Sequence, residues 1–197
     1  MRKIVELDIS ISPGGFLTEL DENHEHPLGE SSDRRKHWIW PGSSRVKNEA
    51  LMQADTVAPT AALVVGRRTY DLVDGWGRTD PFEGESVFVL TGAGLNEPPQ
   101  DKPPFTRVAE GIASAVAQAI AAAGDENVYV IDGVNVAQKA ISARQLDEIR
   151  LHLVPLLLGE EILLFEQSSE ESLVLERIRV MQAPGVTHIW FRMLNRQ

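Results

Sequence analysis

Two short apolar runs, each followed by a glycine and a helix-like segment, constrain the fold of this chain most. The first run is Ala62–Val65, which ends at Gly66. The second is Val128–Ile131, which ends at Asp132-Gly133 and precedes apolar residues at helical spacing. Apolar runs of four residues are typical of strands that are buried on both faces of a parallel sheet. Strands that alternate with helices in this way predict an α/β fold built from crossover units.

The first of these junctions has the features of an anion site. After Gly66 the chain continues with Arg67-Arg68-Thr69 and begins a short helix. The start of a helix offers free backbone N–H groups and the positive end of the helix dipole. Two arginines and a hydroxyl group add to these donors, so the junction favours a bound phosphate. A tight turn with two solvated arginines would fit the same residues.

Similar patterns place the other helices and strands. The segment Gly111–Ala123 predicts a helix, because its aliphatic side chains form one stripe and Gly124 stands where a left-handed C-cap is expected. Ala183-Pro184-Gly185 is expected to join the last two strands as a hairpin. We expect strands at residues 2–12, 86–91, 105–108, 173–181 and 186–193.

Polar side chains alternate with apolar ones in the last third of the chain. Between residues 149 and 153, aliphatic side chains alternate with Arg150 and His152. Alternation of this kind is typical of a strand with one buried and one solvated face. We therefore expect His152, and His188 in a later strand, to lie on exposed strand faces.

Two further pairs of residues could belong to a site. Trp38 and Trp40 could form the wall of a pocket for a flat ligand, although core packing is the more frequent reason for two tryptophans so close together. His24 and His26 have a spacing that metal ligands use, but no third ligand stands at a useful distance along the chain. We expect a solvated loop there and no metal site.

Composition narrows the classes of function. The chain has 29 acidic and 19 basic side chains, a formal net charge of −10, and such a surface repels nucleic acid and anionic membranes. It has no cysteine, which excludes disulfides and thiolate metal sites. No apolar run approaches the roughly 20 residues that span a bilayer, and no signal peptide is evident. We expect one domain over residues 1–197, a cytoplasmic location, and neither nucleic acid nor membrane as a partner.

The residues of the first junction resemble a known family. The stretch Leu63–Asp71 resembles the strand–turn–helix of dihydrofolate reductases. It is closer still to the reductase domain of the bifunctional riboflavin-biosynthesis deaminase-reductases and to their small stand-alone bacterial relatives. Leu146–Gly159, with the following Leu164-Phe165, is similar to the penultimate region of the same family.

The resemblance covers nearly the whole chain and implies an architecture. This is a dihydrofolate reductase-like, three-layer α/β fold with helices on both faces of a mixed, mostly parallel central sheet and an antiparallel C-terminal hairpin. It further implies that NADPH is the cofactor. Together with the long apolar C-terminal strands, it implies a homodimer.

The same resemblance assigns residues to the cofactor and the substrate. The loop after the first strand would lie near the nicotinamide, the first junction would hold phosphates, the end of the third strand would contact the adenine ribose, and the second junction would carry the pyrophosphate. Trp38 and Trp40 are the candidates for stacking on the substrate. The cofactor residues implied are, in this order, Gly15, Phe16 and Leu17; Gly66, Arg67, Arg68 and Thr69; Thr91 and Gly92; and Ile131, Asp132, Gly133, Val134, Asn135 and Val136.

Three positions depart from the family pattern. Gly14 stands where the relatives usually have an aspartate before Gly15, and Asp132 replaces the first of two glycines. Gly92 stands where an arginine usually holds the 2′-phosphate of NADPH. Discrimination between NADPH and NADH would then depend on Arg67 and Arg68.

These features predict an NADPH-dependent reductase that transfers hydride to a C=N or C=O bond of a pterin, a pyrimidine or a related flat heterocycle. For the proton, we expect either water or Asp132, because no motif selects among the other carboxylates. The alternative is a catalytically degenerate protein of the same fold that still binds NADP(H) or another ligand. A hydrolase is disfavoured, because the chain has no Gly-x-Ser-x-Gly motif.

Overall fold

A computed structural model describes most of the chain. The described residues are 4–19, 60–72, 85–92, 105–131, 133–157, 161–165, 173–183 and 185–194. Four of the residues considered above, Trp38, Trp40, His24 and His26, lie outside these ranges, as does Asp132. Within the described ranges, no helix combines the length and the apolarity that a membrane crossing requires.

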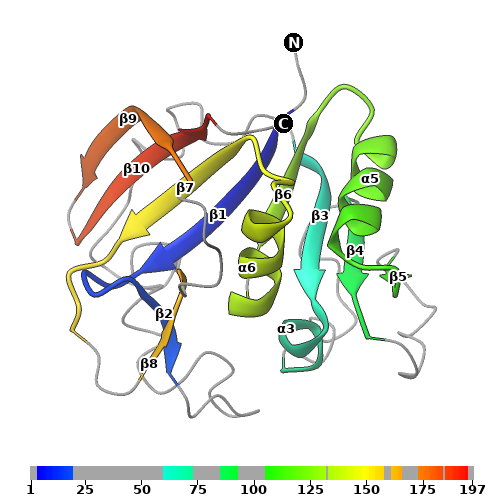
Figure 1. The fold of residues 1–197 in the computed structure, drawn as a ribbon, viewed down its shortest axis with the longest axis horizontal. Coiled ribbons are helices and arrows are strands. Elements are labelled where there is room, and N and C mark those ends of the chain that lie inside the picture. The colour runs from blue at the N-terminus through cyan, green and yellow to red at the C-terminus, as the bar shows by residue number, and fades with distance from the viewer. Residues whose placement is uncertain are drawn as a thin grey trace.

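An eight-stranded mixed sheet forms the centre of the structure (Figure 1). Its strand order is β5-β4-β3-β6-β1-β7-β10-β9. The neighbours from β5 to β7 are parallel, and β10 pairs antiparallel with both β7 and β9. The mostly parallel sheet and the C-terminal hairpin are therefore confirmed. The strands are β1 (Val5–Ile11), β3 (Thr60–Gly66), β4 (Ser86–Leu90), β5 (Phe105–Val108), β6 (Asn127–Ile131), β7 (Glu148–Leu153), β9 (Leu175–Ala183) and β10 (Val186–Met193).

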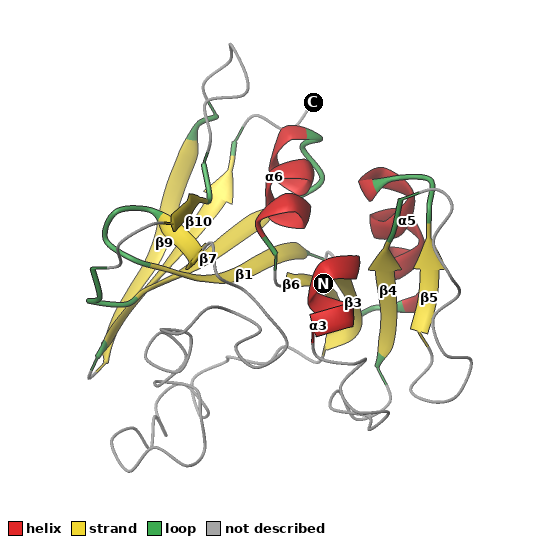
Figure 2. Ribbon diagram, turned by 90° about the horizontal axis from the view of Figure 1, so that it is seen from below, coloured by secondary structure: helices red, strands yellow, loops and turns green. Residues whose placement is uncertain are grey.

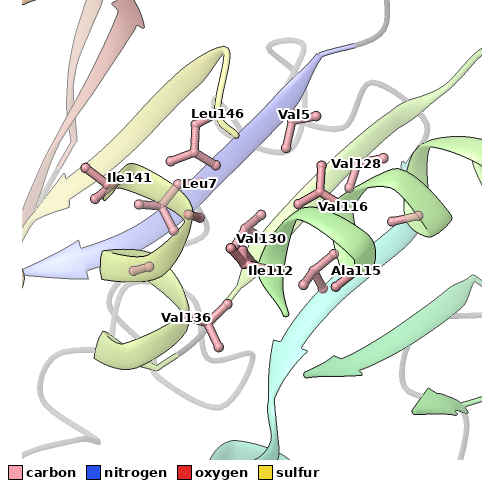
Figure 3. Close-up of a cluster of buried hydrophobic side chains, with 14 of the residues drawn as sticks. Val5, Leu7, Ile112, Ala115, Val116, Val128, Val130, Val136, Ile141 and Leu146 are labelled. Atoms are coloured by element: carbon pink, nitrogen blue, oxygen red, sulfur yellow. The ribbon is translucent and has the colours of Figure 1, made fainter. Parts of the chain in front are cut away.

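Helices lie on both faces of the sheet, as expected. The helices α5 (Ile112–Ala122) and α6 (Val134–Ser142) lie on the same side of the sheet (Figure 2). They cover a buried aliphatic cluster that includes Leu7 and Val130 (Figure 3). The short helix α3 (Arg67–Leu72) places Tyr70 in a second buried cluster, formed by side chains of the opposite face. Gly124 has a φ of +59°, which confirms the left-handed turn after α5.

A second, two-stranded sheet was not expected from the sequence. It pairs β2 (Phe16–Glu19) antiparallel with β8 (Glu161–Leu163). The loop expected after β1 is therefore short, because the chain turns at Gly15 and enters β2 at once. Strands of three and four residues are too short to show a periodic pattern, and their pairing joins segments that are far apart in the chain.

The two faces of β1 differ in chemistry, although both are buried. Val5, Leu7, Ile9 and Ile11 belong to the aliphatic cluster under the helices. Glu6 points to the other face and is only 4% exposed. On this same polar face, the neighbouring strands carry Arg150, His152, His188 and Trp190, all of them buried.

The expectation that His152 and His188 lie on exposed faces is wrong. Their exposed fractions are 3% and 0%. The alternation of polar and aliphatic residues in β7 separates two buried faces rather than a buried face and a solvated one. Several of these polar side chains pair with one another there, so local polarity does not report exposure.

Candidate functional site

The two strand–glycine–helix junctions lie next to each other in the structure. β3 and β6 are parallel neighbours, so both end at the same edge of the sheet (Figure 1). A Cβ atom added to Gly66 would lie 3.0 Å from Cγ2 of Val136 in α6. A Cβ atom added to Gly133 would lie 3.4 Å from Oγ1 of Thr69 in α3. We call the combined site, residues 66–69 and 133–136, the cradle.

The cradle exposes backbone donors rather than side chains. Gly133 has a φ of +92°, a conformation that L-residues with a side chain rarely adopt. In the described part of the chain, no side chain caps the N-terminal N–H groups of α6, and its first turn has no acidic residue. Val134 and Asn135 stand in this first turn, and Asn135 is exposed. Uncapped N–H groups at the start of a helix favour an anion.

Two cations belong to the cradle. Arg67 is turned along its own helix, with Nε 2.6 Å from Oδ1 of Asp71, and 23% of its side chain is exposed. Arg68 is exposed. Thr69, which follows them, is buried against Gly133. Arg68 therefore adds a positive charge to the cradle, whereas the charge of Arg67 is paired with Asp71, and the threonine contributes to the packing between the two junctions.

A third cation reaches the same edge of the sheet from β5. Arg107 donates from Nε to Oγ1 of Thr91 at 3.2 Å, at the point where β4 ends. The same hydroxyl group lies 3.3 Å from the carbonyl oxygen of Val108, to which it donates. The next residue, Gly92, is exposed, and no atom of the described residues lies within 4 Å of where its Cβ would be. Arg107 therefore lies beside Thr91 at the point where β4 ends.

The sequence did not single out Arg107. One arginine in a four-residue strand carries no motif, and only the parallel pairing of β5 with β4 brings it to Thr91. The expectation that Thr91 and Gly92 end a strand of the parallel sheet is nonetheless met. A basic residue in the strand that follows the glycine-rich loop was the only available signal.

The loop after β1 is tied to the small second sheet. Gly15 has a φ of +81°, and its N–H donates to the carbonyl of Ser12 at 2.9 Å. Its own carbonyl accepts from the N–H of Leu164 at 3.0 Å. Phe16 and Leu17 belong to β2. Among the described residues, no backbone hydrogen bond joins this loop to the cradle.

The polar face of the central strands forms a second candidate site. Five ionisable side chains gather there, and we call them the charged cluster: Glu6, Asp8, Arg150, His152 and His188. The guanidinium of Arg150 contacts two carboxylates, Glu6 at 2.7 Å and Asp8 at 3.3 Å. It also lies over the ring of Trp190, 5.4 Å from the centroid.

A chain of three groups leads from Asp8 into the sheet. Oδ1 of Asp8 lies 2.8 Å from Nε2 of His152. The other ring nitrogen of His152, Nδ1, lies 2.6 Å from Nδ1 of His188. The two rings meet edge to face, with their centroids 4.8 Å apart. A contact between two Nδ1 atoms holds one proton, because two N–H groups would collide and two lone pairs would repel.

Burial and neighbouring charges shift the pKa values of the cluster in different directions. Burial raises the pKa of Glu6 to about 7, even though Arg150 opposes the shift. Burial also acts to raise the pKa of Asp8, but His152 and Arg150 outweigh it, so that this pKa lies below its ordinary value. Burial and His152 together lower the pKa of His188 to about 4. Burial and Glu6 raise the pKa of Tyr129, beside the cluster, to about 12.

The cluster reaches the neighbourhood of the cradle through Asp8. In the register of the sheet, Asp8 stands between Ile131 of β6 and Arg150 of β7. Ile131 is the last residue of β6, two positions before Gly133 of the cradle. The side chain of Asp8 is 26% exposed, whereas that of His152 is 3% exposed. Asp8 is thus the accessible end of the chain of three groups.

No local pattern in the sequence predicts the cluster, because its members are spread over distant segments. Glu6 and Asp8 interrupt a mainly aliphatic strand, and this was the one local signal. A central strand of a parallel sheet is buried on both faces, so acidic residues there need partners. Their partners lie more than 140 residues further along the chain.

Known proteins resemble this chain in structure rather than in sequence. No model of a protein family matches the sequence, and no curated protein is significantly similar to it. A candidate riboflavin biosynthesis protein from Shewanella sp. PV-4 is 23% identical, with a TM-score of 0.70 over 98% of this chain and 99% of that one. A pyrimidine reductase-like protein from Corynebacterium diphtheriae is 14% identical, with a TM-score of 0.63 over 98% of this chain and 92% of its own.

A dihydrofolate reductase is similar over its whole length as well. The enzyme from Enterococcus faecalis, solved in complex with NADP(H) and a compound named RAB-propyl, is 12% identical. Its TM-score is 0.57, over 96% of both chains. The three proteins differ in sequence but share the overall fold of this chain. The chain therefore has a dihydrofolate reductase-like fold.

Proposed function

We propose that this protein is an NADPH-dependent reductase that transfers hydride to a C=N or C=O bond of a flat heterocycle such as a pterin or a pyrimidine. The contact between the two junctions is the observation that carries the proposal. It brings Gly66 and Gly133, the uncapped start of α6 and two arginines to one edge of the sheet. A dinucleotide needs such a surface, because its phosphates are anionic and its backbone must be approached closely.

The residues present fit the cofactor. The cradle would hold the pyrophosphate at the N–H groups of Gly133, Val134 and Asn135, with Arg68 as a counter-charge. Thr91, Gly92 and Arg107 would lie along the adenine ribose. NADPH would supply the hydride, and the protein would supply its position and its electrostatic surroundings. That a dihydrofolate reductase of the same fold was solved with NADP(H) supports this assignment.

Titration of the full chain with NADPH, followed by nicotinamide fluorescence, tests the proposal. We expect saturable binding that Arg68→Ala weakens. Lys139→Ala, which removes an exposed cation from the last turn of α6, should leave the affinity unchanged. Absence of saturable binding to the wild-type chain would contradict both the reductase and a degenerate cofactor-binding protein.

Turnover separates these two functions. Oxidation of NADPH in the presence of dihydropterins or pyrimidinones, followed by loss of the nicotinamide absorbance, is expected for a reductase. Binding without oxidation across such a panel would favour a protein that keeps the fold and has lost catalysis. Gly14, Gly92 and Asp132, which depart from the family pattern, are the residues that favour this alternative.

A further inference from the structure

The charged cluster is not required by the fold. The opposite face of the same strands is filled by aliphatic side chains such as Leu7 and Ile149, which pack under the helices. Ionised groups placed on an interior face lose their hydration, and this costs free energy unless every charge is paired. Polar groups that are retained in such a place, with pKa values displaced in opposite directions, are typical of functional sites.

The cluster divides into an ion pair and a series of three side chains in contact through their polar atoms. Arg150 and Glu6 form an ion pair with short contacts, and neither side chain is more than 10% exposed. Asp8, His152 and His188 form a continuous series of contacts between atoms that can each bind a proton, at 2.8 and 2.6 Å. Both ring nitrogens of His152 are used in this series, so its ring orientation is fixed by Asp8 on one side and His188 on the other.

We propose that Asp8, backed by His152 and His188, is the outlet of a proton path that ends beside the cradle and supplies the proton for reduction at the nicotinamide end of the bound cofactor. The use of the path in a reduction rests on the proposed function. The contacts of the three side chains, from which the path is inferred, do not depend on that function. Asp8 is the catalytic residue of the path, whereas His152 and His188 are positioning residues that act through it.

The transfer can be written so that protons and electrons balance. Bound NADPH would supply hydride to the carbon of a C=N bond, and the electron pair of that bond would move to the nitrogen. A proton would pass from Nε2 of His152 to the carboxylate of Asp8 and on to this nitrogen, so that Asp8 ends the step ionised, as it began. His188 accepts the Nδ1–H of His152 throughout and stays neutral. Water returns the lost proton through Asp8 once the product has left.

The surroundings of the path determine which group gives up its proton. The charged and titratable groups that face it are Glu6 on β1, Tyr129 on β6, and Glu148 and Arg150 on β7, with Arg179 of β9 over the ring of Trp190. Arg150 and His152 hold the pKa of Asp8 below its ordinary value. Asp8 therefore passes on a proton that arrives from His152 and does not store it.

Exchange of the imidazole N–H protons with water, measured by NMR on the full chain without any ligand, tests the path directly. In the wild type, the Nε2–H of His152 should exchange through Asp8. Asp8→Ala should slow this exchange, and added formate should restore it by replacing the lost carboxylate. Asp8→Asn, which keeps the shape of the side chain, should slow the exchange in the same way and covers the case in which the alanine variant does not fold.

Glu148→Gln is the matched control, because it makes the same carboxyl-to-amide change on a neighbouring strand outside the path. It should leave the exchange rate of His152 unchanged. Equal exchange in the wild type and in both Asp8 variants, or no effect of formate on Asp8→Ala, would overturn the proposal. Merely structural damage would not be repaired by formate.

Turnover of a probe then tests whether the path serves the reduction. With 7,8-dihydropterin as the acceptor, Asp8→Asn should slow NADPH oxidation by about 100-fold or more, the usual contribution of a positioned acid, and should remove its pH dependence. If exchange is slowed in the Asp8 variants but the wild type does not oxidise NADPH with any of the dihydropterins or pyrimidinones, the result would support the path and contradict the reductase. Normal turnover in Asp8→Asn would overturn the role of Asp8.

Discussion

Arg107 places a cation at the end of β4, where the family that this chain resembles usually has an arginine and this chain has Gly92. Gly92 replaces the arginine expected there, yet Arg107 arrives from the neighbouring strand and lies 3.2 Å from Thr91. If it holds the 2′-phosphate, Arg107→Gln should weaken NADPH binding by about tenfold or more, as expected for a hydrogen bond to a charged group. NADH lacks this phosphate, so its affinity should stay the same. Fluorescence titration with both cofactors measures the difference.

Arg67 and Arg68 allow the complementary comparison. If they also contribute to discrimination, Arg67→Ala or Arg68→Ala should weaken NADPH binding more than NADH binding. An equal loss for both cofactors would mean that the two arginines contact the pyrophosphate or stabilise the fold. The contact of Arg67 with Asp71 favours a structural role for Arg67. Lys139→Gln should change neither affinity. If Arg107→Gln weakened both cofactors equally, Arg107 would have no role in discrimination.

At the scale of elements, the polar face shared by β1, β7 and β10 makes the free energy of unfolding depend on pH. The pKa of Glu6 is raised to about 7, so the folded state keeps a proton that the unfolded chain releases above about pH 4.5. Its contribution to stability is therefore lost as pH rises from about 4.5 to 7. The pKa of His188 is lowered from 6.5 to about 4, so its contribution is lost as pH falls through that range.

Between about pH 4.5 and 6.5, the contribution of Glu6 to stability therefore falls with rising pH, while that of His188 rises. Glu6→Gln removes one of them, so the free energy of unfolding of this variant should rise with pH in the window, by roughly 2–3 kcal/mol more than in the wild type. Urea unfolding at several pH values between about 4 and 8 measures it. A variant whose pH profile runs parallel to that of the wild type would show that Glu6 does not titrate in this range.

The elements of this fold differ in how far the sequence could predict them. β3, β6 and α5 were predictable, because each is a continuous apolar pattern that a glycine ends, and this information is local. The position of β1 between β6 and β7 was not, because strand pairing depends on contacts between distant segments. The charged cluster was missed for the same reason. A face covered with mutually paired polar groups has the same local pattern as a solvated face, and only the partners of Arg150 and His152 distinguish the two.

At the scale of the whole molecule, the edge strand β9 suggests how two copies associate. β9 is the last strand in the order of the sheet, and its side chains Ile178 and Val180 are 37% and 46% exposed. An exposed apolar edge strand is a ready site for pairing with another chain. We expect a homodimer, and we expect Val180→Lys to convert it to monomers by placing a buried charge in the interface. Sedimentation velocity at micromolar concentration measures the change.

Leu157→Lys is the control for this experiment. Leu157 is also a large exposed apolar residue, at 83%, but it lies outside β9, between β7 and β8. The control should stay dimeric. A wild-type chain that sediments as a species of 21.8 kDa would contradict the dimer altogether.

The central place of β1 has a consequence for how the chain folds during synthesis. Both neighbours of β1, β6 and β7, follow it by more than 100 residues, and its contacts with Asp147 and Arg150 span 142 residues. At the usual rate of translation, the ribosome needs roughly 10–30 s to add such a length. Throughout that time β1 has no partner in its own sheet, and Glu6 and Asp8 remain hydrated. Glu6 and Asp8, which are costly to bury in the finished core, thus keep a mainly aliphatic strand soluble until β6 and β7 have been synthesised.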